Sequence, residues 1–472
     1  MLDSLNIFIA RLQAISISML IVVIVICLFV SMKRRKKSMD TSSLKYSFRS
    51  DRVHGIVFGR DSHGRLVYSP TNQEGSCFVV GQPGSGKTSA LLIPTLRSWT
   101  GSSLTIDISG DISTNVDCPR KLIFAPGTSD TLPYNIFGYI DDLHSIPDQD
   151  EALENLGYLL MPEQPDASSN AKYFQDGGRS MLIAALISFY HQGVDFCDIC
   201  STIVDSSFKV LLSQIDKSGN SRAISYINQF EGALDTNSQG CKQNADNAIR
   251  LFATNPAVQE SLHRSGVGEH AITPTDIESH NVFIVIPDQK LKIYAPLLSI
   301  ITAQAFDHFS NRPNGASPTI LLCLDEFHSL GKLPIGDALR KLRKKNVRIM
   351  VLTQSINDID EVYGRDAHKS MIDNFAFKVI LGAGGSDTQE YFSRMIGMEQ
   401  QEKKSFTRPG GLLSPVSSET TAYSNEYIIS PADLGRLGSK LILLHPSGYD
   451  FLKKNHYFKS TFFDKIFRHF ER

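Results

Sequence analysis

One glycine-rich segment constrains the fold of this chain more than any other feature. Its sequence is Gly81-Gln-Pro-Gly-Ser-Gly-Lys-Thr88; the apolar, strand-like residues 76–80 precede it, and a helical stretch at 89–97 follows. In such a unit, small residues let successive backbone N–H groups point at phosphates, Lys87 reaches the β and γ oxygens, and Thr88 ligates Mg²⁺. A coincidental glycine turn is the alternative, but the flanking strand and helix are the context that the motif requires.

The sequence therefore predicts a P-loop nucleotide site with ATP and Mg²⁺ as its cofactors. The expected nucleotide-binding residues are Gly81, Gly84, Ser85, Gly86, Lys87, Thr88 and Ser89.

A pair of carboxylates supplies the second half of such a site. The apolar run 319–324 ends in Asp325 and Glu326, where a buried strand would meet solvent at the carboxyl edge of a sheet. We expect Asp325 to hold Mg²⁺ together with Thr88, and Glu326 to orient and deprotonate the attacking water. Alternatively, the two side chains only cap the next element.

Two further polar residues are candidates because of their spacing from this pair. Gln354 follows the strand-like run 347–352, where a side-chain amide can contact the γ-phosphate or position water; the alternative is a solvated loop glutamine. Arg343 belongs to a basic cluster on an expected helix. It is either part of a solvated face or a guanidinium that reaches the γ-phosphate of a neighbouring subunit. The expected catalytic residues are therefore Lys87, Glu326, Arg343 and Gln354.

Strand-like and helical stretches alternate through most of the chain, which predicts an α/β domain on a mostly parallel sheet. Helical periodicity replaces the strand pattern in the middle of the chain and indicates a helical insert. A segment rich in serine, threonine, glycine and proline, 400–425, is expected to be a mobile loop, with a folded element as the alternative. The strand-like runs lie at 76–80, 103–108, 121–125, 282–286, 319–324, 347–352, 377–381 and 440–444.

An apolar run near the N-terminus predicts a membrane anchor. Residues 14–32 are almost wholly apolar, and about 20 such residues cross a bilayer as a helix. The basic run 33–37 follows, against the single Arg11 before it, so the positive-inside rule places the N-terminus outside and the catalytic part in the cytoplasm. A cleaved signal peptide is the alternative, but its charge would precede the apolar run. We therefore expect a single-pass protein of the cell inner membrane.

The chain has 472 residues, which is longer than an ordinary single domain. These patterns divide it into four parts. The expected parts are an anchor at 1–37, a first part of the NTPase domain at 48–150, an all-α insert at 151–280, and a second part with a C-terminal extension at 281–472.

The charge balance and the cysteine content exclude few classes of function. The 48 basic and 49 acidic residues nearly cancel, so no global basic field indicates nucleic-acid binding. The seven cysteines are scattered, which is typical of a reducing compartment, and the pair Cys197 and Cys200 lacks the second pair that a zinc site needs.

Aromatic and basic residues interleave in 451–472. This end is interpreted as a docked helix, with a partner site or a nucleic-acid site as the alternatives.

Several of these motifs together resemble a known family, the coupling proteins of conjugation and type IV secretion of the TraG/TraD type. The resemblance covers most of the chain after about residue 50, and the stretch 325–364 is more specific to the family than the P-loop is. The matching segments are Gly81 to Thr88, Asp325 to Pro334, Gln354 to Gly364 and, more weakly, Tyr134-Asn135 and Leu381 to Gly397.

This resemblance implies a RecA-like P-loop motor domain with an inserted all-α domain, assembled as a homo-hexamer around a channel. Such proteins receive single-stranded DNA with its relaxase, effector proteins, or both, and deliver them to the components of a type IV secretion channel. By the same resemblance, Arg343 approaches the nucleotide of a neighbouring subunit, and Gln354 approaches that of its own.

Two departures from the family pattern concern function. The family usually has two spanning helices, whereas this chain offers one, and the turn Asp107 to Asp111 lacks the lysine that the family commonly has there. The leading hypothesis is an ATP-driven coupling motor. The alternatives are a non-hydrolysing receptor platform that nucleotide stabilises, and a DNA-pumping motor of the chromosome-segregation type.

Overall fold

A computed structural model describes residues 44–459 apart from 51–52, 71–74, 165–166, 233, 267, 334 and 408–417. The expected spanning segment at 14–32 and the basic run at 33–37 lie outside the described residues, as do the last residues of the C-terminal extension. Among the helices that are described, none is both long and apolar enough to cross a bilayer. The anchor therefore stays a prediction.

The described chain builds one mixed sheet of 12 strands, in the order β1-β3-β2-β14-β13-β10-β4-β9-β8-β5-β7-β6. The strands from β10 to β6 pair in parallel, and those from β13 to β1 pair antiparallel. The parallel strands are β10 (Phe377–Gly382), β4 (Cys77–Gly81), β9 (Val347–Thr353), β8 (Ile320–Leu324), β5 (Ser102–Asp107), β7 (Asn281–Val285) and β6 (Lys121–Phe124). The antiparallel strands are β13 (Lys440–His445), β14 (Gly448–Lys453), β2 (Gly55–Arg60), β3 (Leu66–Pro70) and β1 (Lys45–Ser47).

Every strand-like run expected from the sequence forms a strand of this sheet, and the α/β P-loop fold is confirmed. The apolar character of the parallel strands follows from burial on both faces. Along β8, Leu321 and Cys323 pack into the core on one face, while Leu322 and Leu324 pack into the core on the other. Of the antiparallel edge, only β13 was expected from the sequence; the other strands were not, and β2 contains two glycines, which weaken a strand pattern.

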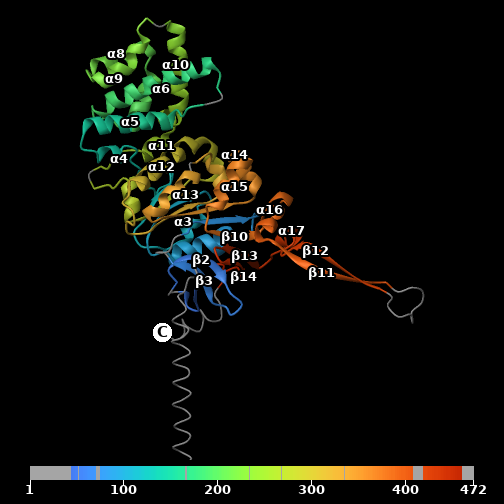
Figure 1. Cartoon of the computed structure of the whole chain (residues 1–472). Coiled ribbons are helices and arrows are strands. Elements are labelled where there is room, and N and C mark those ends of the chain that lie inside the picture. Colours follow the sequence, from blue (N-terminus) through green and yellow to red (C-terminus); the bar gives the residue numbers. More distant parts are fainter. Residues whose placement is uncertain are drawn as a thin grey trace, which may run out of the picture. The chain divides into compact units, whose positions relative to one another are not determined.

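Helices cover the two faces of the sheet (Figure 1). One face packs against the helix that follows the P-loop, a π-helical segment η2 (Lys87–Leu92) that continues as α2 (Ile93–Ser98), and against α3 (Asp111–Asn115). The other face carries most of the remaining helices of the sheet domain. These are α12 (Leu291–Asn311), α13 (Ile335–Lys341), α14 (Ile356–Tyr363), α15 (Arg365–Asp373), α16 (Ser386–Ile396) and α17 (Pro431–Leu434).

The chain between β6 and β7 folds into a cluster of helices. Serine and asparagine caps begin several of them: Ser145 accepts a hydrogen bond at α5, Ser168 at α6 and Asn220 at α9. Helix α6 is central, since it packs against α5, α7, α8, α9 and α10, and its second half is almost wholly buried. The helices are α4 (Gly138–Asp141), α5 (Ile146–Leu160), α6 (Ser169–Tyr190), α7 (Phe196–Asp205), α8 (Phe208–Lys217), α9 (Ser221–Ile227), α10 (Asp235–Thr254) and α11 (Pro256–Ser261).

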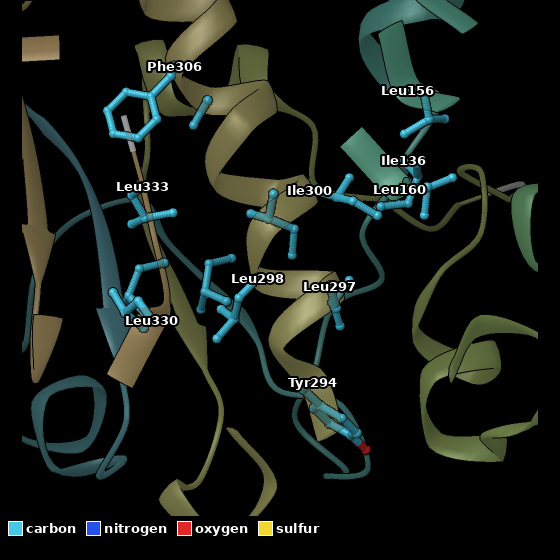
Figure 2. Packing of buried hydrophobic residues seen from close by; sticks show 14 of the residues in the cluster. Ile136, Leu156, Leu160, Tyr294, Leu297, Leu298, Ile300, Phe306, Leu330 and Leu333 are labelled. Carbon is cyan, nitrogen blue, oxygen red and sulfur yellow. The ribbon is translucent and has the colours of Figure 1, made fainter. Parts of the chain in front are cut away.

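Helix α12 joins this cluster to the sheet domain through one continuous hydrophobic core. Figure 2 shows Leu297 and Ile300 of α12 on the side of Leu156 and Leu160 from α5. On its other side, Phe306 lies near the segment that carries Leu330 and Leu333, just beyond β8 (Figure 2). The core therefore runs from the helical cluster through α12 to the residues that follow the carboxylate pair.

The prediction of a mobile loop at 400–425 is wrong for the described part of that segment. There the chain forms the strands β11 (Met398–Thr407) and β12 (Ser418–Tyr427), which pair antiparallel as a separate two-stranded sheet (Figure 1). Cross-strand pairing over ten residues stabilises this hairpin although its side chains are mostly polar. Composition alone indicated a loop because it carries no information about pairing between the two halves of the segment.

Candidate nucleotide site

The glycine-rich segment leaves β4 at Gly81 and turns into η2 at Lys87. Gly84 and Gly86 adopt φ values of 72° and 99°, which residues with a Cβ rarely adopt. Gly81 is constrained by space instead, because a Cβ there would lie 2.4 Å from Ser85 Oγ. The local sequence thus folds into the tight, backbone-lined turn that a phosphate cradle requires.

Lys87 is held at the base of this turn. Its side chain is only 6% exposed, its Nζ donates a hydrogen bond to Gly81 O at 2.8 Å, and the same Nζ lies 3.6 Å from Glu326 Oε1. The structure therefore brings the lysine of the P-loop beside the carboxylate pair, although Lys87 and Glu326 are 239 residues apart in the sequence.

The carboxylates emerge at the carboxyl end of β8. Glu326 adopts φ 43°, a left-handed conformation that is strained for a non-glycine residue and is frequent at functional sites. The segment that follows is anchored, because Phe327 stacks on Tyr363 at 5.3 Å and the Tyr363 hydroxyl accepts a hydrogen bond from Leu333 N. Packing thus holds Glu326 in an orientation that its own backbone preference would not select.

Gln354 joins the same group from the neighbouring strand. It lies between the end of β9 and Ser355, whose side chain caps α14. Its Nε2 donates a hydrogen bond to Glu326 Oε2 at 3.0 Å. Glu326 is therefore contacted by an amide on one side and approached by the Lys87 ammonium on the other.

Asp325 has the environment of a cation ligand. It is 3% exposed, and its Oδ1 is buried without a hydrogen-bond partner among the described residues. Burial, and then the negative charges of Glu326 and Asp107, raise the pKa of Asp325 to about 7, although Lys87 acts in the opposite direction. A divalent cation would satisfy the orphaned oxygen and relieve this repulsion, so these residues fit Mg²⁺.

Asp107, at the end of the adjacent strand β5, has a structural role instead. Its Oδ1 accepts a hydrogen bond from Gly110 N at 2.8 Å, and its Oδ2 accepts one from Ser113 N at 2.7 Å. Both oxygens are thereby used to close the turn into α3.

Thr88 and Ser89 lie in the first turn of η2, just after Lys87, and both are half-buried. Ser89 Oγ lies 3.0 Å from His456 Nδ1, and Ser89 O accepts a hydrogen bond from Tyr457 N. The sequence analysis missed this neighbour of the P-loop, because nothing in the local pattern of residues 454–459 connects them to position 89.

Arg343 is not brought to this group. It is exposed in the short helix η7 (Leu342–Lys345), before the start of β9, whereas Gln354 follows the end of that strand. A strand rises about 3.3 Å per residue, so Arg343 lies at the opposite edge of the sheet, roughly 20 Å from its own chain's P-loop.

Comparisons with known proteins agree with this architecture. Residues 34–469 match the family described as Type IV secretory system Conjugative DNA transfer. The chain is 22% identical to "Protein VirD4" of Agrobacterium fabrum over 370 residues, which cover 75% of this chain and 54% of the relative. It is 21% identical to "Conjugal transfer protein TraG" of the same organism over 392 residues, 77% of this chain and 57% of the relative. The chain thus spans about half the length of the curated relatives it matches.

Solved structures show the same fold. The unbound conjugative coupling protein TrwBdeltaN70 is 17% identical and superimposes with a TM-score of 0.64 over 82% of this chain and 85% of its own. The complex of TrwB with ADP and Mg²⁺ is 18% identical and superimposes with a TM-score of 0.62 over 82% and 86%.

Proposed function

This chain belongs to the Type IV secretory system Conjugative DNA transfer family, and on that premise we propose that it is a P-loop ATPase acting as a coupling protein. It binds and hydrolyses ATP, and uses the energy to feed substrates to a type IV secretion channel. The observation that carries the proposal is the convergence of Lys87, Asp325, Glu326 and Gln354 at the ends of three adjacent strands. Relatives named for conjugal transfer and for secretion-system coupling support it.

Each residue has a distinct role in the proposed reaction. The backbone N–H groups of residues 84–89 surround the phosphates, and Lys87 exchanges its contacts with Gly81 O and Glu326 for the β and γ oxygens. Glu326 then accepts the proton of the attacking water, while the Gln354 amide keeps this carboxylate in position. Thr88 and Asp325 hold Mg²⁺, which when bound neutralises charge on the β- and γ-phosphates.

The position of Arg343 favours a role between subunits. Since it lies at the far edge of its own sheet, it can reach a γ-phosphate only across an interface, as in a ring. We therefore include a homo-hexamer in the proposal, with a guanidinium from one subunit completing the site of the next.

The remaining parts of the proposal concern place and partners. The apolar run at 14–32 anchors the chain in the inner membrane, with the N-terminus outside and the motor in the cytoplasm. The partners are secretion-channel components, and the substrates are single-stranded DNA with its relaxase, effector proteins, or both. Labelling of single-cysteine variants at residue 4 and at residue 40 in intact cells tests the topology: label at residue 40 alone would overturn it.

ATP turnover by the purified chain tests the enzymatic proposal. We expect Lys87→Ala to lose nucleotide binding, and Glu326→Gln to retain binding but lose roughly 10²–10⁴-fold in turnover, as for removal of a general base. The exposed Lys209→Ala in the helical cluster is the control and should match the wild type. Binding that depends on Lys87 without turnover above Glu326→Gln would favour the nucleotide-stabilised receptor instead.

A mixing experiment tests the ring and the role of Arg343 together. Arg343→Ala and Lys87→Ala should each be inactive alone, because every site then lacks one essential group. In mixed rings, an intact P-loop can face an intact Arg343 of its neighbour, so part of the activity should return. Absence of recovery in rings shown to be mixed would contradict the role in trans.

A further inference from the structure

The residues that follow β14 lie against the P-loop, and they are held there at several successive positions. Lys454 Nζ donates a hydrogen bond to Leu381 O at 2.9 Å, and Asn455 Oδ1 accepts one from the buried Arg60 at 2.9 Å. His456 and Tyr457 contact Ser89, as described above. These contacts fix residues 454–457 across the start of the helix that follows the P-loop.

His456 closely approaches the phosphate-binding turn itself. Its Cε1 would lie 3.0 Å from a Cβ placed on Gly86. Gly86 thus needs to be glycine for two reasons, its positive φ and the imidazole beside it. The next residue, Tyr457, makes a cation–π contact with Arg97, whose guanidinium lies 4.9 Å from the centroid of the tyrosine ring.

The next residue exposes an aromatic ring. Phe458 is 61% exposed, and its ring lies 5.2 Å from that of His456 at an interplanar angle of 30°. Lys459 Nζ lies 5.8 Å from the same ring. An exposed phenylalanine on an anchored segment is an available stacking surface, because burial in the core does not use it.

The direction of the nucleotide follows from the order of the strands. Glu326, at the end of β8, marks the γ-phosphate end of the proposed site, on one side of β4. The strands β10, β13 and β14 lie on the other side of β4. Since a triphosphate laid along the loop continues from its α-phosphate into the nucleoside, the base must lie away from Glu326, toward the side on which residues 454–459 cover Ser89.

We propose that residues 454–459 form the nucleoside end of the site, in which Phe458, backed by His456, stacks on the purine base of a nucleoside triphosphate. This inference rests on the proposed function, since it assigns a further part of the same site. The neighbouring cavity of about 200 Å³ beside residues 82–85 is lined largely by glycines, leucines and Lys454, and none of its described lining residues is aromatic. Loss of stacking on one aromatic side chain weakens binding about 5- to 150-fold per base.

Competition against a fluorescent mant-ADP probe on the full-length chain tests the proposal, with ATP and inorganic tripolyphosphate as the two competitors. Phe458→Ala should weaken ATP binding about fivefold or more and leave tripolyphosphate binding unchanged, because tripolyphosphate has no base. Because the probe also carries a base, its own affinity is measured for each variant first. Phe458→Trp should retain ATP affinity, and nucleotide should quench the new tryptophan.

The matched control is Phe451→Ala, since Phe451 is 51% exposed on the preceding strand β14 and should change neither competitor. An equal loss for ATP and tripolyphosphate in Phe458→Ala, or no loss for either, overturns the proposal. If Phe458→Ala weakens only the binding of fluorescent oligothymidylate, the ring belongs to a strand-binding surface instead. Failure of the proposed function looks different, because then the wild type itself shows no binding that depends on Lys87.

Discussion

Removal of the buried Arg312 guanidinium should cost much of the stability of this fold. Arg312 follows directly after α12, and its side chain is 2% exposed. Its Nε and Nη2 donate to the two oxygens of Glu278 at 2.7 and 2.9 Å, its Nη2 also donates to Pro318 O at 2.8 Å, and its Nη1 donates to Lys345 O. Arg312→Met fills similar space but leaves these acceptors without their donor.

The magnitude follows from that geometry. Breaking a buried ion pair by removing one partner costs about 3–5 kcal/mol. Glu278 keeps His308 as a partner at 2.9 Å and its side chain is 30% exposed, so we expect the lower end, about 3 kcal/mol. Against a total stability of roughly 5–15 kcal/mol, this is a large loss. Adding Glu278→Leu should recover part of it, because the double variant no longer holds a partly buried carboxylate that has lost its guanidinium partner.

Urea unfolding followed by fluorescence of Trp99, the single tryptophan, measures this loss within the sheet domain, where Trp99 is 8% exposed. The control is Lys209→Met, which removes the exposed pair with Asp235 (side chains 77% and 70% exposed) and should cost less than about 1 kcal/mol. A loss in Arg312→Met no larger than in Lys209→Met would refute the reasoning. ATP turnover is a second readout, since Arg312 holds the turn that carries Arg343.

Three further predictions follow from individual contacts. Burial raises the pKa of Glu278, but hydrogen bonds from His308 and Arg312 outweigh burial and hold the pKa below its usual value. The ionised Glu278 therefore stabilises the fold fully above about pH 4.5, and this stabilisation is lost as pH falls through the folded pKa. Glu278→Gln should flatten the acid side of the pH–stability curve. Gly84→Ala should cost about 1 kcal/mol from its positive φ alone, because no heavy atom of the described residues lies within 4 Å of the added Cβ. Gly86→Ala should cost more, since its Cβ also meets His456; equal urea midpoints for the two variants would contradict this. Replacing residues 399–426 by a short glycine linker should leave the urea midpoint nearly unchanged, because the described strands of the hairpin pair with each other and not with the main sheet. A large loss of stability would show that the hairpin packs on the body.

The sequence by itself determined the P-loop, the carboxylate pair and the parallel strands. These features are local: a strand buried on both faces is a continuous apolar run, and a phosphate cradle needs glycines and a lysine at fixed spacing within eight residues. Reading Gly81 to Thr88 and the run ending in Asp325 and Glu326 therefore required no knowledge of the remaining chain.

Only the tertiary structure decided which distant segments meet. The contact of Gln354 with Glu326, the placement of Arg343 at the far edge of the sheet and the seating of His456 on Ser89 all depend on strand order. The pairing of β11 with β12 likewise depends on contacts between the two halves of one segment, which the composition of that segment does not report. Local composition and periodicity report how one segment folds, whereas contacts between segments arise from packing the whole sheet around one core.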